Sequence, residues 1–414
     1  MVADPQHSTG NAEVFGFALR LSVFYAAIFY MVGSFMPYFP VWLDWRGLAP
    51  EQIGIVLAAP LLMRIGFTPL IAFLSDRLGN PRLVLIMLAW SALASFALMT
   101  QAEGFLQILA VAVLASVFWT SIMPLSETIA MAGVRNAGHD YGRMRLWGSL
   151  TFIAASFAGG VVLQRWGPAS ALQMLLASIA LVALAAHFLP RPTGQGRLRR
   201  ATTVPRIRFR DAARVARSPV FLLFLFTTGC IQSGHAIYYA FGTLHWRSQG
   251  LSGEVIGLLW AVGVAAEILL FMFSRRVVAS LGVLNLIWIG AGAAILRWSL
   301  TALSPPLWLL FPVQSLHALT FGASHLAAVH FISSAVPEEA SGTAQGLYAA
   351  YTAGIAMGAM MALSGLLYDA LAQWAYFVMA GLGVVALAGA TLLRRLWDGR
   401  HLIALDSGSA PEAG

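Results

Sequence analysis

The chain has 414 residues, of which 59% are hydrophobic and 10% are charged. A soluble domain carries about 25% charged residues, so this composition excludes a water-soluble globular protein and predicts a polytopic membrane protein. All 25 basic residues are arginine, and with 17 acidic residues they give a formal net charge of +8. The arginines flank apolar segments instead of forming one patch on a soluble fold, which argues against a nucleic-acid partner.

The N-terminal segment and the cysteine content exclude further features. The first fifteen residues are polar and lack a basic region before a short apolar core, so we predict no cleaved signal peptide. The first membrane span then acts as its own insertion signal. Cys230 is the only cysteine, which excludes an intramolecular disulfide and a cysteine-based metal cluster. We predict no metal and no cofactor.

A membrane-spanning helix needs about 20 apolar residues, and the chain offers twelve such segments. They lie in chain order at 17–43, 51–75, 82–101, 104–131, 142–164, 168–189, 218–246, 252–274, 282–303, 305–332, 340–368 and 371–396. The predicted organisation is a tail (1–16), a six-helix bundle (17–189), a basic linker (190–217), a second six-helix bundle (218–396) and a C-terminal tail (397–414). The predicted fold class is an all-α membrane protein of two such bundles.

The distribution of arginine predicts the topology, because positive residues collect on the cytoplasmic side of a membrane. Nine arginines lie between Arg191 and Arg217, whereas the connections expected outside hold only Arg46, Arg165 and Arg247. Both termini and the linker are therefore predicted to be cytoplasmic, in the inner membrane of a bacterium, with the lipid bilayer as a partner. We expect a monomer.

The two halves of the chain repeat each other. The second span opens with "GLAPEQIG" (47–54) and the eighth with "GLSGEVIG" (250–257), 203 positions later. The same offset relates Arg64 to Glu267 and Gly79 to Gly282. Six spans repeated in the same orientation indicate a two-bundle transporter, whose site lies between the bundles near the membrane midplane.

Three ionisable residues lie deep in their predicted spans. Arg64, Glu267 and Arg297 are each about 20 Å from a helix end in a membrane core about 30 Å thick. Such residues usually face a cavity and serve function, although a buried ion pair that only fixes helix packing would give the same pattern. We predict that these three charges serve the function of the protein.

Glu127 and Arg145 flank one short cytoplasmic turn and are predicted to lie at similar depth. A carboxylate, a guanidinium and the nearby Trp147 could grip a polar solute through bidentate hydrogen bonds and stacking. An interfacial salt bridge is the alternative interpretation. In the seventh span, Gln232, His235 and Tyr239 share a helical face and either line the cavity or pack.

The tenth span reads "QSLHALTFGASHLAAVHF" and is rich in histidine. His317, Thr320 and Ser324 fall on one face by their three- to four-residue spacing, with His325 about 80° away. A histidine in a membrane cavity can titrate near neutral pH, so His317 is a candidate functional residue. A histidine that only donates to a backbone carbonyl is the alternative.

The loop "FLSDRLGNPR" (73–82) resembles the signature of the major facilitator superfamily. The resemblance rests on Asp76, Arg77, Gly79 and Arg82, with Ala72 where a glycine usually stands. The resemblance implies that these residues form a gate on the cytoplasmic side, which holds the transporter in one conformation until it opens. The resemblance implies the major facilitator fold.

A closer resemblance, covering most of the first eleven spans, is to the phenylpropionate-permease branch of that superfamily, which is related to lactose permeases and nucleoside–proton symporters. It rests on the segments "PYFPVWL", "YGRMRLWGS", "HAIYYAF" and "LHALTFGASH".

By position, Glu127 and Arg145 match the sugar-holding pair of lactose permeases, and Glu267 matches the acid that links substrate to proton. Arg297 and His317 match their coupling network. Thr320 departs from the pattern, because lactose permeases carry a glutamate there. Glu267 or Glu127 is then left to carry the proton.

These observations predict a proton-coupled importer of a small organic solute that works by alternating access. The candidate cavity charges are three arginines and two glutamates, and this excess of positive charge favours an organic carboxylate, aromatic or not. The predicted substrate-binding residues are Glu127, Arg145, Trp147, His235 and Tyr239. The coupling residues are Glu267, Arg297, His317 and Arg64.

Other functions remain open at this point. A sugar or nucleoside symporter and a drug–proton antiporter are the alternative transporters. A receptor or a membrane enzyme belongs to a different class, but no nucleophile–base constellation, phosphate-binding loop or metal-ligand set is visible in the sequence. We therefore predict that the chain is not an enzyme.

Overall fold

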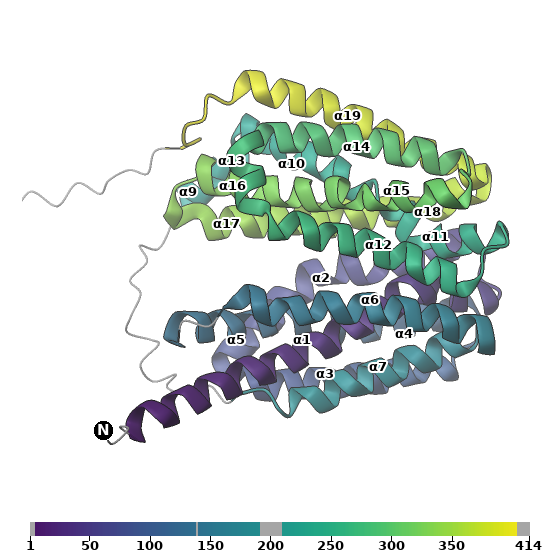
Figure 1. Ribbon diagram of the computed structural model, residues 1–414, viewed down its shortest axis with the longest axis horizontal. Coiled ribbons are helices and arrows are strands. Elements are labelled where there is room, and N and C mark those ends of the chain that lie inside the picture. Colours follow the sequence, from purple (N-terminus) through teal and green to yellow (C-terminus); the bar gives the residue numbers. More distant parts are fainter. Residues whose placement is uncertain (1–4, 138–139, 191–208, 404–414) are drawn as a thin grey trace, which may run out of the picture.

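The structure is a computed structural model that describes residues 5–137, 140–190 and 209–403. Within these ranges every regular element is a helix. The helices form two bundles (Figure 1), as predicted. Counted in chain order with interrupted helices joined, the described helices make twelve segments, six in each bundle, and nine described helices are long and apolar enough to cross a membrane. Counts and absences below refer to these described ranges.

The first bundle holds the first six segments. Two of them are not simple α-helices: α3 continues into the short 3-10 helix η1, and α4 and α5 together make the fourth segment. The elements are α1 (Pro5–Trp45), α2 (Pro50–Leu78), α3 (Pro81–Ala97), η1 (Leu98–Thr100), α4 (Gly104–Trp119), α5 (Ile122–Ala137), α6 (Tyr141–Trp166) and α7 (Ser170–Ala186).

The second bundle is more interrupted. Its first segment is divided into α10 and α11, and its fourth and fifth contain the π-helical turns η2 and η3. The short helix α9 (Phe209–Arg217) precedes it. The elements are α10 (Pro219–Ser233), α11 (Ala236–Ser248), α12 (Gly253–Met272), α13 (Ser274–Leu281), α14 (Val283–Ala302), α15 (Leu307–Ser315), η2 (Ala318–Ala323), α16 (Ser324–Ala335), α17 (Glu338–Ala349), η3 (Ala350–Ala356), α18 (Met357–Leu371), η4 (Ala372–Trp374) and α19 (Ala375–Leu396).

The repeat seen in the sequence is also a repeat in backbone geometry. The turn before α2 places Gly47 at φ 80°, and the turn before α12 places Gly250 at φ 81°. In the first turn the Leu48 amide donates to the carbonyl of residue 43 at 3.2 Å, and in the second Leu251 donates to that of residue 246 at 3.1 Å. Both turns need a left-handed residue, which glycine adopts without steric cost.

The two bundles meet at the end of the molecule that carries these two turns, which we call the turn end. The Gly253 amide donates to Gln164 Oε1 at 2.8 Å across the interface. A Cβ atom on Gly160 would lie 2.0 Å from the carbonyl oxygen of Gly253, and one on Gly365 would lie 2.2 Å from that of Pro50. At both places backbone packs directly on backbone, so this end is closed.

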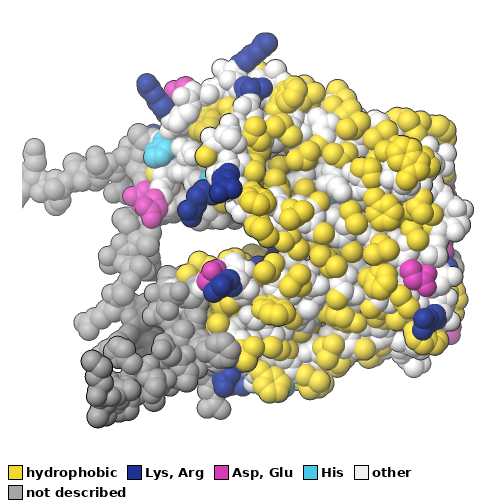
Figure 2. All heavy atoms as spheres, viewed as in Figure 1, with side chains coloured by type: hydrophobic (Ala, Val, Ile, Leu, Met, Phe, Trp, Pro, Cys, Tyr) yellow, Lys and Arg dark blue, Asp and Glu magenta, His cyan; other side chains and the backbone are white. Residues whose placement is uncertain are grey.

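The opposite end, which we call the linker end, carries α9 and the described residues that follow α19 (Figure 1). There the bundles separate, and Figure 2 shows a hollow between them. Apolar side chains cover most of the remaining surface in that view. Large apolar side chains are exposed elsewhere in the described chain too, and Leu106, Trp308 and Met272 reach 75%, 72% and 65%. This belt is the surface that a lipid bilayer covers.

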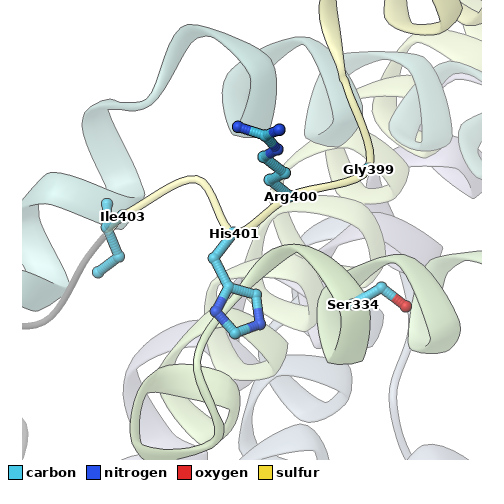
Figure 3. Close-up of a pocket in the computed structure, with 5 residues that line it drawn as sticks. All are labelled: Ser334, Gly399, Arg400, His401 and Ile403. Atoms are coloured by element: carbon cyan, nitrogen blue, oxygen red, sulfur yellow. The ribbon is translucent and has the colours of Figure 1, made fainter.

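The C-terminal segment packs against the linker end of α16. The Leu402 amide donates to the Ala335 carbonyl at 2.7 Å, and the rings of Phe331 and Trp397 lie 4.7 Å apart. An open pocket of about 490 Å³ lies beside this segment (Figure 3). It is lined by Ser334, Gly399, Arg400, His401 and Ile403. The pocket is separate from the charged residues inside the spans.

Candidate functional site

In the first bundle, Arg145 of α6 pairs with Glu127 of α5. The Nε atom of Arg145 lies 3.6 Å from Oε1 of Glu127, and the two side chains are 30% and 28% exposed. The sequence placed both residues beside one short turn, and the structure brings them together. The pair is partly open, so its hydrogen-bonding atoms remain accessible to a solute.

The aromatic partners of Arg145 come from α1. Its guanidinium carbon lies 3.9 Å from the ring centroid of Phe29 and 5.5 Å from that of Tyr25. Cation–π contacts of this kind hold a guanidinium in place without neutralising it. Trp147, the aromatic residue that the sequence suggested for this role, is 56% exposed.

In the second bundle, Arg297 of α14 is fully buried. One terminal nitrogen donates to His317 Nδ1 at 3.1 Å and to Thr320 Oγ1 at 3.0 Å, and the other donates to Gln314 Oε1 at 2.9 Å. The rings of Tyr238 and Trp298 lie 4.9 Å and 4.5 Å from its guanidinium carbon. Its direct hydrogen-bond partners carry no formal negative charge.

The contacts of His317 fix where its hydrogen sits. A guanidinium only donates hydrogen bonds, so Nδ1 of His317 must accept from Arg297. A neutral ring then carries its hydrogen on Nε2, which lies 3.3 Å from Oε2 of Glu267 on α12. His317 therefore connects Arg297 to Glu267, and the sequence had placed these three residues in one coupling network.

The contacts of His235 extend this chain. Its Nδ1 lies 3.2 Å and 3.0 Å from the carbonyl oxygens of Ile231 and Gln232, so it donates, and its Nε2 accepts from the Thr320 hydroxyl at 3.0 Å. Thr320 thus accepts from Arg297 and donates to His235. The ring of Tyr239 stacks on His235 at 5.5 Å.

His235 and Tyr239 were predicted to bind solute or to pack. His235 is fully buried, and its contacts make it part of the network around Arg297. Gln232, on the same face, donates to Ser324 Oγ at 3.0 Å. The solute contacts predicted for His235 and Tyr239 stay predictions.

The two charged clusters face each other across the bundle interface. Glu267 is 19% exposed, and it interacts electrostatically with Arg145 of the other bundle and with His325. The interface helices α6 and α12 pack closely, with Gly257 against the backbone of Ser156. A solute between the bundles would therefore contact the Arg145–Glu127 pair of the first bundle and Glu267 of the second.

Sequence reasoning missed several members of these clusters. Gln314, Tyr238 and Trp298 surround Arg297, and Tyr25 and Phe29 hold Arg145. Gln314 lies three residues before His317 and so shares its helical face, a signal that was available in the sequence. The aromatic residues carried no such signal, because contacts between helices depend on how each helix is rotated.

The predicted gate residues lie at the linker end of the first bundle. Asp76 and Arg77 are exposed, and Gly79 ends α2 in a left-handed conformation at φ 65°. Arg82 donates to the His187 carbonyl at 2.5 Å within the same bundle.

Arg64 of α2 is partly buried. In the described part of the chain, no group of three or more His, Cys, Asp or Glu residues is placed to hold a metal ion.

Comparison with known proteins identifies the family. Residues 18–379 match the model of the MFS_1-like family. The chain is 30% identical over 367 residues to a probable 3-phenylpropionic acid transporter of Escherichia coli K12, covering 87% of this chain and 93% of that protein. It is 28% identical over 354 residues to the maltose permease of Geobacillus stearothermophilus, covering 84% and 87%.

Solved structures agree in fold. The crystal structure of the nucleoside transporter NupG superposes with a TM-score of 0.79 at 18% identity, covering 92% of this chain and all of that one. A bacterial homologue of the human lysosomal transporter Spinster gives 0.72 at 16% identity, covering 93% and 97%. These relatives are transporters and not enzymes. The chain therefore belongs to the MFS_1-like family, and it is a membrane transporter of the major facilitator superfamily.

Proposed function

We propose that this transporter couples the uptake of a small organic solute to protons, and that the solute is an aromatic or other organic carboxylate. The observation that carries the proposal is the position of Glu267. This acid is joined through His317 to the buried Arg297, and it faces Arg145 across the bundle interface. Glu267 is a titratable acid beside the Arg145–Glu127 pair, where we place the solute, so its protonation is linked to solute binding.

The charge of the site supports an anionic solute. Arg64, Arg145 and Arg297 outnumber Glu127 and Glu267 by one positive charge. Phe29 and Tyr25 place aromatic surface beside Arg145, which suits a solute with a ring. The relative named for 3-phenylpropionic acid, an aromatic carboxylate, points the same way.

The proposed cycle uses alternating access. Glu267 is the proton carrier, because Thr320 does not ionise in the physiological range. Protonated Glu267 and the solute occupy the site together, the bundles rock, and both leave toward the other side. When Glu267 is ionised and the solute has left, the hydrogen bond from His317 and the charge of Arg297 stabilise it and reset the transporter.

The proposed orientation places the linker end in the cytoplasm of a bacterial cell, with the protein in the inner membrane as a monomer. The closed turn end and the hollow at the linker end then correspond to a conformation open to the cytoplasm. Asp76, Arg77, Gly79 and Arg82 lie beside the open mouth, where they would form the gate when that mouth closes.

The test is uptake of radiolabelled carboxylates by proteoliposomes with an imposed pH gradient. The Glu267→Gln variant should lose accumulation driven by the gradient, because the side chain no longer exchanges a proton. It should retain solute exchange between the two sides when no gradient is applied. The matched control is Glu254→Gln in the first turn of the same helix, which should accumulate solute as the wild type does. Wild-type accumulation by Glu267→Gln would contradict the proposal.

A neutral sugar or nucleoside is the second candidate solute. The Arg145–Glu127 pair favours it, since the pair offers a donor and an acceptor to the hydroxyls of a neutral solute. The maltose permease relative agrees with this alternative. Uptake of maltose or uridine in the same vesicles, without uptake of any carboxylate, would establish it in place of the first.

A further inference from the structure

Arg64 lies on the inward face of α2. With about 100° of rotation per residue, it shares that face with Leu57 and Ile71, each about 20° away, and both of these are buried. The opposite face carries Leu62 and Phe73, which are 41% and 60% exposed. Leu62 lies against Gly358 of α18 in the second bundle. Arg64 therefore lies on the face of α2 that packs within the first bundle, where it is only partly buried.

Arg64 differs from the other charges at membrane depth in having no partner. Arg145 pairs with Glu127, and Arg297 and Glu267 share His317. Within the described residues Arg64 makes no hydrogen bond or ion pair. An unpaired cation inside a membrane protein is unfavourable, so an anion from outside the chain would stabilise this site.

Hydroxyl groups lie near Arg64 along α2 and at the break between α4 and α5. Thr68 follows one turn later and about 40° around the helix, and the Ser121 hydroxyl lies 3.5 Å from the Thr68 hydroxyl. Ser121 occupies the break between α4 and α5. A guanidinium with hydroxyl groups one turn away matches a carboxylate, which accepts two parallel hydrogen bonds from arginine.

We propose that Arg64 binds the carboxylate of the transported solute. This assignment rests on the proposed function, in which the solute is an organic anion, and it gives Arg64 a different role from the coupling role predicted from the sequence. Arg145 is already paired with Glu127 and held by two rings, so an anion there would have to displace Glu127. Arg64 accepts an anion without displacing any group.

The experiment measures binding to the purified protein by calorimetry. The probes are 3-phenylpropionate, benzoate and succinate, together with the uncharged amides of the first two. In Arg64→Gln, the Kd of the carboxylates should rise by about 10- to 100-fold, the effect of losing hydrogen bonds to a charged group. The Kd of the amides should change by less than about threefold, because an amide makes no ion pair with the guanidinium.

Two further variants make the result specific. Arg64→Lys keeps the charge but loses the bidentate geometry, so its preference for acid over amide should lie between those of the wild type and Arg64→Gln. Arg275→Gln, an exposed arginine of α13, should bind every probe as the wild type does. Thermal melting of each variant shows whether it is folded, and Arg64→Lys carries the test if Arg64→Gln is not.

The outcomes separate this inference from the proposed function. If the wild type prefers the acids and Arg64→Gln keeps that preference, Arg64 is not the anchor, although carboxylate transport stands. If Arg64→Gln weakens the binding of acids and amides equally, the role of Arg64 is structural and the inference fails. If the wild type binds no carboxylate in preference to its amide, the proposed solute class fails first, and the assignment of Arg64 fails with it.

Discussion

Thr320 shows how one hydroxyl can hold two charged or titratable groups in place. It accepts a hydrogen bond from Arg297 and donates one to His235, and all three side chains are buried. Thr320→Val keeps the shape of the side chain but removes one hydrogen bond from Arg297 and leaves Nε2 of His235 without its partner. The free energy of unfolding should fall by about 1–3 kcal/mol, the usual effect of stranding buried polar groups, measured as a lower melting temperature in detergent.

Thr391→Val is the matched control for this change. The Thr391 hydroxyl is near the surface and bonds only to the carbonyl of Leu387 in its own helix, so its loss should leave the melting temperature almost unchanged. Equal melting temperatures for Thr320→Val and the wild type would show that the network does not depend on this hydroxyl.

The sequence predicted the candidate site residues better than it predicted the hydrogen bonds and ion pairs between them. Glu127 with Arg145, and His317 with Thr320, could be paired because each pair spans a short turn or shares a helical face. Arg297, His317 and Glu267 were predicted to act in one coupling network, and the structure shows that His317 lies between the other two. That arrangement depends on the relative rotation of α12, α14 and the tenth segment, which no local pattern encodes.

Individual helices were predictable as spans but not in their interruptions. Length and hydropathy located all twelve segments, because the membrane requires each to be long and apolar. The breaks after Thr120 and at Gly234, and the π-helical turns η2 and η3, were not predicted. The two breaks hold short polar stretches, 120–121 and 232–235, between apolar residues. Hydropathy averaged over the length of a span does not separate such short stretches from the rest of the helix. π-helical turns occur often at functional sites, and η2 carries Thr320.

The helix contacts at the turn end should control which conformation is populated. Gly253→Ala adds a methyl group that would lie 2.2 Å from the Gly160 carbonyl oxygen, so α6 and α12 must move apart. We expect the population to shift toward a conformation open at the turn end, more strongly for Gly253→Val. Spin labels at positions 166 and 303, in a chain with Cys230→Ser, would report this shift as a longer distance.

Gly292→Ala in α14 is the control for this experiment, because nothing lies within 4 Å of the added Cβ atom. It should leave the distance distribution as it is in the parent chain. An unchanged distribution in both Gly253 variants would mean that the contact does not limit opening.

For the whole molecule, the arginine distribution should determine its orientation. The long basic linker and the sparse arginines at the turn end predict cytoplasmic termini. A green fluorescent protein fused after residue 414 should fluoresce, whereas alkaline phosphatase at that position should be inactive. Alkaline phosphatase inserted after Gly167, in the turn between α6 and α7, should be active. The reverse pattern would invert the proposed orientation and the proposed direction of access.

The overall fold followed from the sequence because the internal repeat and the superfamily loop signature agree on two bundles of six. The conformation did not follow from it. A hollow at the linker end and a closed contact at the turn end define one conformation of the transporter. The conformation open at the turn end must satisfy the same hydropathy pattern, so the pattern does not distinguish the two.

The backbone-to-backbone contacts at the turn end also decide how this interface can be studied. Alanine scanning finds an interface by removing side chains, but Gly160, Gly253 and Gly365 have none to remove. Truncation would report this surface as unimportant, although it is where the bundles approach most closely. Only the addition of atoms, graded from alanine to valine, can measure it, and the size of the added group then becomes a means of setting the resting balance between the two open states.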